Sequence, residues 1–290
     1  MIPRRPHLIG ILFMLASMLT YAFVNASVKS VIMDYPAPQV LFFRYAPALI
    51  PYVFLILHAR HDHPTTTSNL RWHMGSACVS IISLWALFTA LGRLPLAEVT
   101  ALTFTSVFFV VLLAAGFLKE RTSLGSWIAL AVGFGGVMIM VNPQHHLLNK
   151  NALLCLMAAF GDAVIMVLAR RLTRQESSLT VVFYFALFGA LITSLFLPFV
   201  WQRPTLPDLG LLLFLGLGGG MAQLLLTKAY EYAPAGVVAP FIYTSLIWAT
   251  LIGYGFWHEA MEGKTLIGAA LVVASGVFVT RHHQAKTAKD

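Results

Sequence analysis

Residues 90–120 read ALGRLPLAEVTALTFTSVFFVVLLAAGFLKE, and residues 229–259 read AYEYAPAGVVAPFIYTSLIWATLIGYGFWHE. The two stretches align without a gap, and the alignment continues as far as Val141 and Thr280. Residue types that rarely match by chance recur in one register: Pro95 with Pro234, Thr105-Ser106 with Thr244-Ser245, Gly116-Phe117 with Gly255-Phe256, and Glu120 with Glu259. This pattern predicts an internal duplication.

The composition around the duplicated stretches is that of a membrane protein. Of the 290 residues, 59% are hydrophobic and 10% are charged, whereas soluble domains carry about 25% charged residues. The mean hydropathy is +0.80. These values exclude a soluble globular enzyme, and they exclude a disordered chain, which needs low hydrophobicity and high charge.

Apolar runs of the length that crosses a bilayer, about 20 residues, cover almost the whole chain. They predict ten spans at residues 8–28, 38–57, 73–92, 96–117, 125–141, 152–169, 179–200, 208–229, 236–256 and 264–281. The first run is longer than the apolar part of a signal peptide, so we interpret it as an uncleaved first span. Ten spans give each half of the chain five.

The basic residues between the spans predict the orientation. With the N-terminus inside, the cytoplasmic segments hold thirteen basic residues: Arg4, Arg5, Arg60, Arg71, Lys119, Arg121, Arg170, Arg171, Arg174, Lys228, Arg281, Lys286 and Lys289. The opposite side holds five: Lys29, Arg93, Lys150, Arg203 and Lys264. Cytoplasmic segments are enriched in Lys and Arg, so we expect a multi-pass protein of the inner (plasma) membrane with both termini in the cytoplasm.

The odd number of spans in each half means that the two halves cross the membrane in opposite senses. Inverted repeats of this kind are typical of secondary transporters that bind substrate near the membrane midplane. The predicted fold is therefore all-α, with ten transmembrane helices in two inverted five-helix repeats, residues 8–141 and 152–281, around a central cavity.

The two halves end in similar motifs, GFLKER at 116–121 and GFWHE at 255–259, and open their fourth and ninth spans with Pro-x-x-x-Val at 95–99 and 234–238. Together with Phe43-Arg44-Tyr45 in the second span, these motifs resemble the EamA domains of the drug/metabolite transporter superfamily. The resemblance implies a ten-helix bundle, alternating access and, most often, export of amino acids or related metabolites. One departure is Phe185, which stands opposite Arg44 in the second half.

Two ionisable residues lie within predicted spans, where a charge is costly and marks a functional hypothesis. Asp162 lies near the middle of its span and Arg44 lies nearer the outer face. In the functional interpretation, Asp162 binds a proton or a substrate ammonium, and Arg44 binds a substrate carboxylate. In the structural interpretation, the two charges are paired within the protein or Arg44 extends to the interface.

Polar and aromatic residues within the spans are candidates for the lining of the cavity. We expect Tyr21, Asn25, Trp85, Gln223, Tyr243 and Trp248 to line it. The alternative is that such groups bond helix carbonyls or neighbouring helices, which is the interpretation we favour for Ser17 and for single threonines. Glu120 and Glu259 are interpreted as structural caps or ion-pair anchors, with a gating role as the alternative.

No cofactor or metal is expected. Gly263-Lys264-Thr265 lacks the first glycine of a phosphate-binding loop, and the histidines at 58, 61 and 63 have no second ligand cluster. The expected partners are a small-molecule substrate, the lipid bilayer and, as an open alternative, protons; nucleic acid is not expected, and the chain is expected to be a monomer or a weak dimer. The alternatives to an exporter are uptake or exchange, a non-transporting receptor or scaffold, and a membrane-embedded enzyme.

Overall fold

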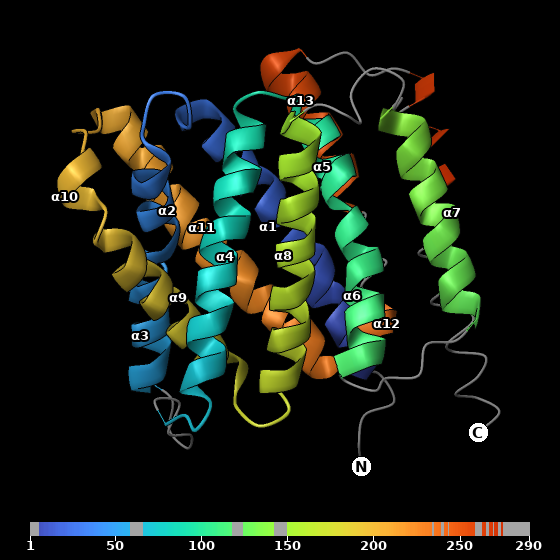
Figure 1. Cartoon of the computed structure of the whole chain (residues 1–290), viewed down its shortest axis with the longest axis horizontal. Helices are drawn as coiled ribbons and strands as arrows, with labels where there is room; N and C mark the ends of the chain where they lie inside the picture. Colours follow the sequence, from blue (N-terminus) through green and yellow to red (C-terminus); the bar gives the residue numbers. More distant parts are fainter. Residues whose placement is uncertain are drawn as a thin grey trace.

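The computed structural model describes residues 6–58, 66–117, 124–141, 150–233, 235–238, 241–242, 244–258, 263–264, 267–268, 270–271 and 274. Every regular element of this described part is a helix (Figure 1). The first half contributes α1 (Pro6–Val31), α2 (Ala37–Tyr45), α3 (Leu49–His58), α4 (Leu70–Leu91), α5 (Leu96–Thr103), α6 (Thr105–Phe117) and α7 (Leu124–Val141). The second half contributes α8 (Lys150–Leu172), α9 (Ser178–Ser194), α10 (Leu197–Val200), α11 (Leu206–Tyr232), α12 (Ala235–Val238) and α13 (Thr244–Trp257).

Nine of the predicted spans fall on these helices or on consecutive pairs of them. Most of the tenth, 264–281, lies outside the described residues, so the count of ten spans stays a prediction. In the described part, five helical stretches are long and apolar enough to cross a membrane: His7–Val31, Ala37–His58, Leu70–Leu91, Leu153–Leu172 and Leu206–Tyr232.

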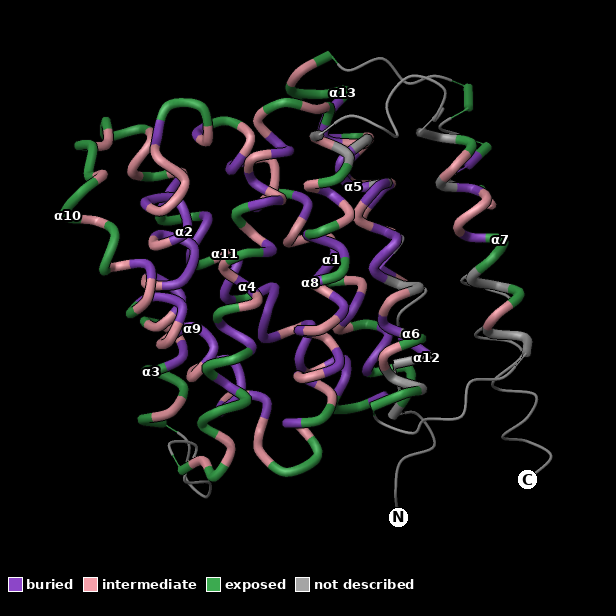
Figure 2. Tube along the Cα trace, viewed as in Figure 1, coloured by how far each residue is buried: buried purple, intermediate pink, exposed green. Residues whose placement is uncertain are grey.

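The outer surface of the bundle is apolar. Large hydrophobic side chains such as Leu57, Phe117 and Phe199 are 76%, 75% and 84% exposed, although soluble proteins keep such side chains from forming wide exposed patches. Figure 2 shows that buried positions gather along the central helices and thin out on α7. Lipid is the solvent that such a surface requires, and the chain is therefore a multi-pass membrane protein.

Two of the predicted spans are interrupted at equivalent positions of the repeat. The fourth span divides into α5 and α6 at Phe104, and in the ninth a 3-10 turn at Phe241 and Ile242 stands between α12 and α13 among the described residues. Thr105 and Thr244, which match in the repeat, each begin the second helix of their pair. The pair α5–α6 runs in the opposite direction to α12–α13 (Figure 1), as two inverted repeats require.

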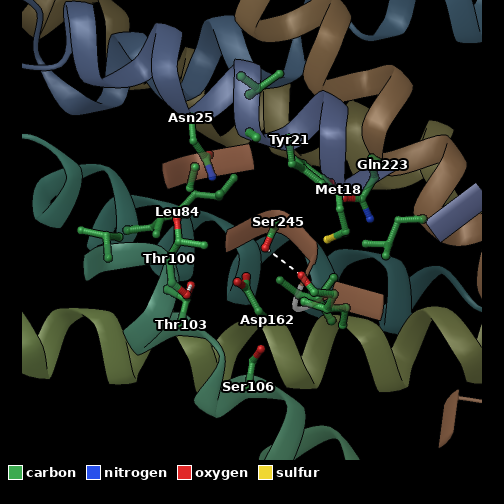
Figure 3. Close-up of a pocket in the computed structure, with 18 of the residues that line it drawn as sticks. Met18, Tyr21, Asn25, Leu84, Thr100, Thr103, Ser106, Asp162, Gln223 and Ser245 are labelled. Atoms are coloured by element: carbon green, nitrogen blue, oxygen red, sulfur yellow. Dashed lines mark hydrogen bonds between the residues drawn. The ribbon is translucent and has the colours of Figure 1, made fainter. Parts of the chain in front are cut away.

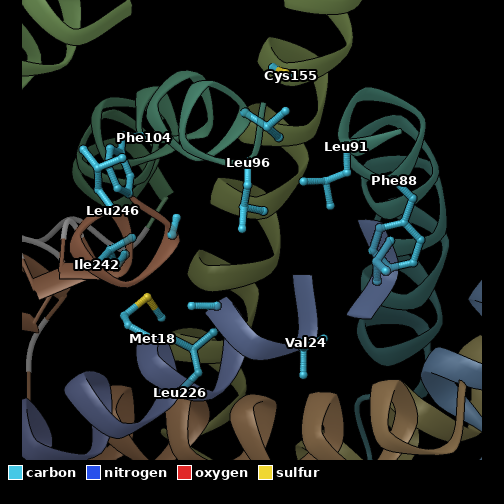
Figure 4. Packing of buried hydrophobic residues seen from close by; sticks show 14 of the residues in the cluster. Met18, Val24, Phe88, Leu91, Leu96, Phe104, Cys155, Leu226, Ile242 and Leu246 are labelled. Carbon is cyan, nitrogen blue, oxygen red and sulfur yellow. The ribbon is translucent and has the colours of Figure 1, made fainter. Parts of the chain in front are cut away.

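The two broken helices pack against each other through apolar side chains. Phe104, 2% exposed, belongs to the same buried cluster as Ile242 and Leu246, and Figure 4 shows the three side chains close together. Met18 of α1 and Leu226 of α11 extend this cluster toward the centre of the bundle. The breaks are therefore held in the core and are not at the lipid surface.

Glycines of α11 allow its backbone to approach α2 and α3 closely. A Cβ atom added to Gly216 would collide with the carbonyl oxygen of Phe43, and one added to Gly220 would lie 2.6 Å from Cβ of Ala48. Small residues at helix contacts permit such close packing in membranes. Because α11 comes from the second half and α2 from the first, the glycines bring the two halves together beside the cavity described next.

Candidate substrate cavity

A cavity of about 140 Å³ lies between the two halves of the chain. Its polar lining comes from many helices (Figure 3): Tyr21 and Asn25 of α1, Arg44 of α2, Ser80 of α4, Thr100 and Thr103 of α5, Ser106 of α6, Asp162 of α8, Gln223 of α11, and Ser245 of α13. Apolar side chains such as Met18, Leu84 and Phe185 fill the intervening wall. This mixture of apolar wall and a few polar groups is typical of small-molecule sites.

Both helix breaks open onto this cavity. Ser106 and Ser245 match in the repeat, and each follows the threonine that begins its helix. The Thr105 hydroxyl donates to the carbonyl oxygen of Leu102 at 2.9 Å, and the Thr244 hydroxyl donates to that of Phe241 at 2.7 Å. These two bonds are equivalent in the repeat, and each ties the first residue of a helix to a carbonyl oxygen three residues before it. In transporters, such breaks are found where they border a binding site.

Asp162 points into the cavity and is oriented by α4. The Ser83 hydroxyl lies 2.9 Å from Oδ1 of Asp162 and 2.8 Å from the carbonyl oxygen of Ala158, one turn earlier on α8. Helices α4 and α8 approach closely here, because a Cβ on Gly161 would lie 2.7 Å from Cβ of Ser83. This close packing fixes the position of the carboxylate.

Arg44 is 4% exposed and lines the cavity. Its Cζ lies 5.9 Å from the centre of the Tyr21 ring, within the range of a cation–π interaction. Its guanidinium packs on Gly219, where an added Cβ would lie 2.6 Å from Cζ. The charges of Arg44 and Asp162 are close enough to interact electrostatically, but no ion pair joins these two described residues.

Tyr21 connects the two central helices. Its hydroxyl donates to Oε1 of Gln223 at 2.5 Å, while Asn25, one turn along α1, also lines the cavity. Ser17, one turn before Tyr21, instead donates to the carbonyl oxygen of Ala222 at 2.8 Å. The polar face of α1 thus divides into a structural part, as expected for Ser17, and a part that faces the cavity.

Two of the remaining predicted site residues, Trp85 and Trp248, do not line the cavity. Trp85 is 44% exposed and does not line the cavity; it is two residues, about 200° around a helix, from Ser83, which faces α8. Trp248 is half-buried against the apolar core beside the cavity and does not line it. Three further predicted residues, Tyr243, Glu120 and Glu259, are outside the described residues.

Sequence reasoning missed a polar face of α4. Four buried polar residues lie on it at helical spacing: His73, Ser76, Ser80 and Ser83. Ser80 accepts a hydrogen bond from the Tyr45 hydroxyl at 2.7 Å and lines the cavity, and Ser83 orients Asp162. Their spacing could have revealed them, since residues three and four apart share a helix face.

Hydrogen-bond clusters join the two halves at opposite ends of the bundle (Figure 1). In the lower cluster, the carboxylate of Glu176, between α8 and α9, accepts from Thr67 at 2.6 Å and from Asn69 at 2.9 Å, and lies 2.7 Å from Nε2 of His73. The upper cluster consists of Tyr35, Gln39, Gln202, Thr205 and Asp208. Within it, the Gln39 amide and the Gln202 backbone exchange bonds of 2.8 and 2.9 Å.

Burial would raise the pKa of the Glu176 carboxyl, but the hydrogen bonds from Thr67, Asn69 and His73 outweigh that effect. Together they hold the pKa of Glu176 below its ordinary value of 4.5. A carboxylate that accepts several hydrogen bonds is stabilised in its charged form. The lower cluster is therefore strongest when Glu176 is ionised.

Residues 8–142 and 149–281 match the EamA-like transporter family. The chain is similar to the pseudopaline exporter CntI of Pseudomonas aeruginosa, with 29% identity over 94% of this chain and 96% of that one. It is also similar to an S-adenosylmethionine uptake transporter of Rickettsia bellii, with 26% identity over 83% of this chain and 82% of that one. A riboflavin transporter of Vibrio cholerae is 29% identical over 97% of this chain and 96% of its own.

The fold is also that of a solved crystal structure, with a TM-score of 0.78 and 18% identity over 95% of this chain and 98% of that one. The matched relatives carry the names of transporters and not of enzymes. The all-helical bundle, the central cavity and the two matched segments lead to one conclusion: this chain belongs to the EamA-like transporter family of the drug/metabolite transporter superfamily.

Proposed function

We propose that the chain is a secondary transporter that exports small amphipathic metabolites, amino acids among them, by alternating access. The observation that carries the proposal is the cavity between the halves, which both helix breaks border and which Arg44 and Asp162 line. Its volume of about 140 Å³ is below the range of roughly 300–1,000 Å³ for drug-sized ligands, which favours a small substrate.

The polar and apolar parts of the lining support an amphipathic substrate. Tyr21, Asn25 and Gln223 offer hydroxyl and amide groups from α1 and α11. Phe185 and Met166, on α9 and α8, offer apolar surface. A substrate with a polar end and a short apolar end satisfies both groups, and amino acids have this form.

We place both termini in the cytoplasm, because thirteen basic residues fall on that side and five on the other. Export is favoured by the similarity to the pseudopaline exporter CntI. Uptake is the second candidate, because other relatives of similar identity carry the name S-adenosylmethionine uptake transporter.

Reconstitution into liposomes tests the proposal. Purified protein is inserted into vesicles loaded with a panel of labelled amino acids, and efflux is followed with and without an imposed pH gradient. The expected result is efflux of at least one amino acid that excess unlabelled compound inhibits and that empty vesicles lack. Absence of flux for every compound in both directions, from protein that remains folded, would overturn the proposal; flux only inward would favour uptake.

The same vesicles test whether Asp162 couples transport to protons. Replacement by Asn keeps the shape of the side chain and removes its charge. If Asp162 carries the proton, Asp162→Asn abolishes transport driven by the pH gradient but leaves exchange of labelled for unlabelled substrate intact. If Asp162 binds the substrate, both activities fall together.

A further inference from the structure

Two opposite charges face the cavity without satisfying each other. Arg44 is almost fully buried, and no carboxylate of the described residues lies within ion-pairing distance of it. Asp162 lines the cavity and accepts a hydrogen bond from the Ser83 hydroxyl on Oδ1, while its Oδ2 has no hydrogen bond to a described residue. A charge in a membrane interior is costly unless a partner compensates it.

The geometry points to the missing partner: we propose that the substrate is a zwitterion whose anionic group binds Arg44 and whose ammonium binds Asp162. This assignment rests on the proposed transport function and names its substrate class. A guanidinium holds a carboxylate through two parallel hydrogen bonds, and a carboxylate is the natural acceptor for an ammonium. A zwitterion bound between Arg44 and Asp162 compensates both charges at once.

Each charged group is held in place by neighbouring residues. Gly219 of α11 and the Tyr21 ring confine the Arg44 guanidinium from two sides. Ser83 of α4 confines the carboxylate of Asp162. We therefore assign Gly219, Tyr21 and Ser83 as positioning residues, which set the separation between the two charges.

The two halves differ at the position of Arg44, and this difference makes the lining of the cavity asymmetric. Phe185 stands in the second half where Arg44 stands in the first, and both side chains line the cavity. One wall is therefore cationic and its repeat counterpart is aromatic. A zwitterion with an apolar side chain can place its carboxylate on the first wall and its side chain near the second.

Binding measurements on purified protein in detergent test the proposal separately from transport. The probes are the twenty protein amino acids, followed by two analogues of the tightest binder: its carboxamide, which lacks the anionic group, and its deaminated acid, which lacks the ammonium. Loss of a hydrogen bond to a charged group weakens binding by about tenfold or more. We expect each analogue to bind at least about tenfold more weakly than the parent amino acid.

The variants Arg44→Gln and Asp162→Asn assign each charge to its partner. Arg44→Gln is expected to bind the amino acid and its carboxamide equally, while still discriminating against the deaminated acid. Asp162→Asn is expected to show the reverse pattern. Lys228→Gln is the control, because it removes a cation of α11 that lies over Phe13 and not in the cavity.

Three results would overturn the inference. One is that folded wild-type protein binds none of the twenty amino acids. Another is that Arg44→Gln weakens the amino acid and its carboxamide by the same factor, which indicates a structural role. The third is that the double variant recovers wild-type affinity, which indicates that the two charges only compensate each other. If any of these results is accompanied by flux of an uncharged compound in vesicles, the zwitterion assignment is wrong but the proposed transport function is retained.

Discussion

The hydroxyl of Tyr35 donates to Oδ2 of Asp208 at 2.7 Å, which joins the loop between α1 and α2 to the first turn of α11. In the register that matches Val40 with Val181 and Phe42 with Phe183, Tyr35 corresponds to Glu176. The residue that anchors the upper cluster therefore has its repeat counterpart at the anchor of the lower one. At each end of the bundle, a loop that follows the first long helix of one half is bonded to a segment of the other half: Tyr35 to Asp208 at one end, and Glu176 to Thr67 and Asn69 at the other.

Replacement of Tyr35 by Phe removes the hydroxyl but keeps the ring. The variant loses the bond to Asp208 and the bond that the Tyr35 oxygen accepts from the backbone of Thr205. We expect a lower Tm for the purified protein in detergent, measured by thermal unfolding. Tyr254→Phe, at a tyrosine that is 54% exposed, is the matched control; an equal loss in both variants would contradict the structural role of the upper cluster.

The stability of the lower cluster depends on pH. Because the folded-state pKa of Glu176 lies below the ordinary value of 4.5, its ionised form contributes stability at neutral pH. That contribution is lost as the pH falls below about 4.5 and through the folded-state pKa. Tm measured between pH 7 and pH 3.5 is expected to fall less steeply in Glu176→Gln than in wild type. Asp34→Asn, at an exposed position, is expected to retain the wild-type slope; identical slopes in all three proteins would contradict the prediction.

Gly219→Ala places a methyl group where the Arg44 guanidinium lies. The new Cβ would be 2.6 Å from Cζ, so the guanidinium must move. We expect a raised KM for transport, with a smaller change in kcat, because the anionic group of the substrate loses its aligned partner. Gly210→Ala on the same helix meets no atom within 4 Å and is expected to behave as wild type. Equal kinetics in the two variants would show that the position of Arg44 is unimportant.

Gln223→Leu removes the acceptor of the Tyr21 hydroxyl and one polar group of the cavity. A lost bond between neutral groups typically costs about 0.5–1.5 kcal/mol, which corresponds to a two- to tenfold weaker affinity. The measurement is substrate affinity in vesicles. The control is Thr193→Leu, since Thr193 is 1% exposed and donates to the carbonyl oxygen of Gly189 at 2.6 Å. An equal effect on affinity in the control would mean that the lining is wrongly assigned.

The distribution of basic residues predicts the position of the C-terminus. A reporter that is active only in the periplasm, fused after Asp290, is expected to remain silent. A reporter that is active only in the cytoplasm, fused at the same position, is expected to be active. Strong periplasmic activity would contradict the orientation of the second half.

The hydropathy of the sequence was sufficient to predict most spans, because crossing a bilayer demands long apolar runs. The repeat showed that Thr105 and Thr244 are equivalent, but it did not predict that a helix begins at each of them. Residues 96–117 contain no proline, so the break at Phe104 had no local signal in the sequence. In the structure, Phe104 is buried in the same cluster as Leu246 of the other repeat. Tertiary contacts override local preference at such points.

The lining of the cavity was predictable at polar residues that lie well inside a predicted span. Tyr21, Asn25, Gln223, Arg44 and Asp162 are costly inside a membrane, and all five line it. Trp85 was wrongly predicted to line the cavity. A tryptophan side chain is equally suited to lipid and to protein, so the residue type does not indicate which way the side chain faces. The serines of α4 were overlooked because a single serine costs little free energy in a membrane helix. Only the spacing of three and four residues between Ser76, Ser80 and Ser83 indicates that they share a buried face.

The glycine face of α11 has a consequence for how this transporter can change its substrate. Neither Gly216 nor Gly220 can accept even one methyl group without moving α2, α3 or the turn between them, so the position of α11, whose Gln223 and Leu226 line the cavity, cannot shift by small steps. Thr100 of α5 and Phe185 of α9 also line the cavity, and substitution there changes the size of a side chain without moving a helix. Selection for a new metabolite, in evolution or in the laboratory, is therefore expected to alter α5 and α9 first and to leave the glycines of α11 unchanged.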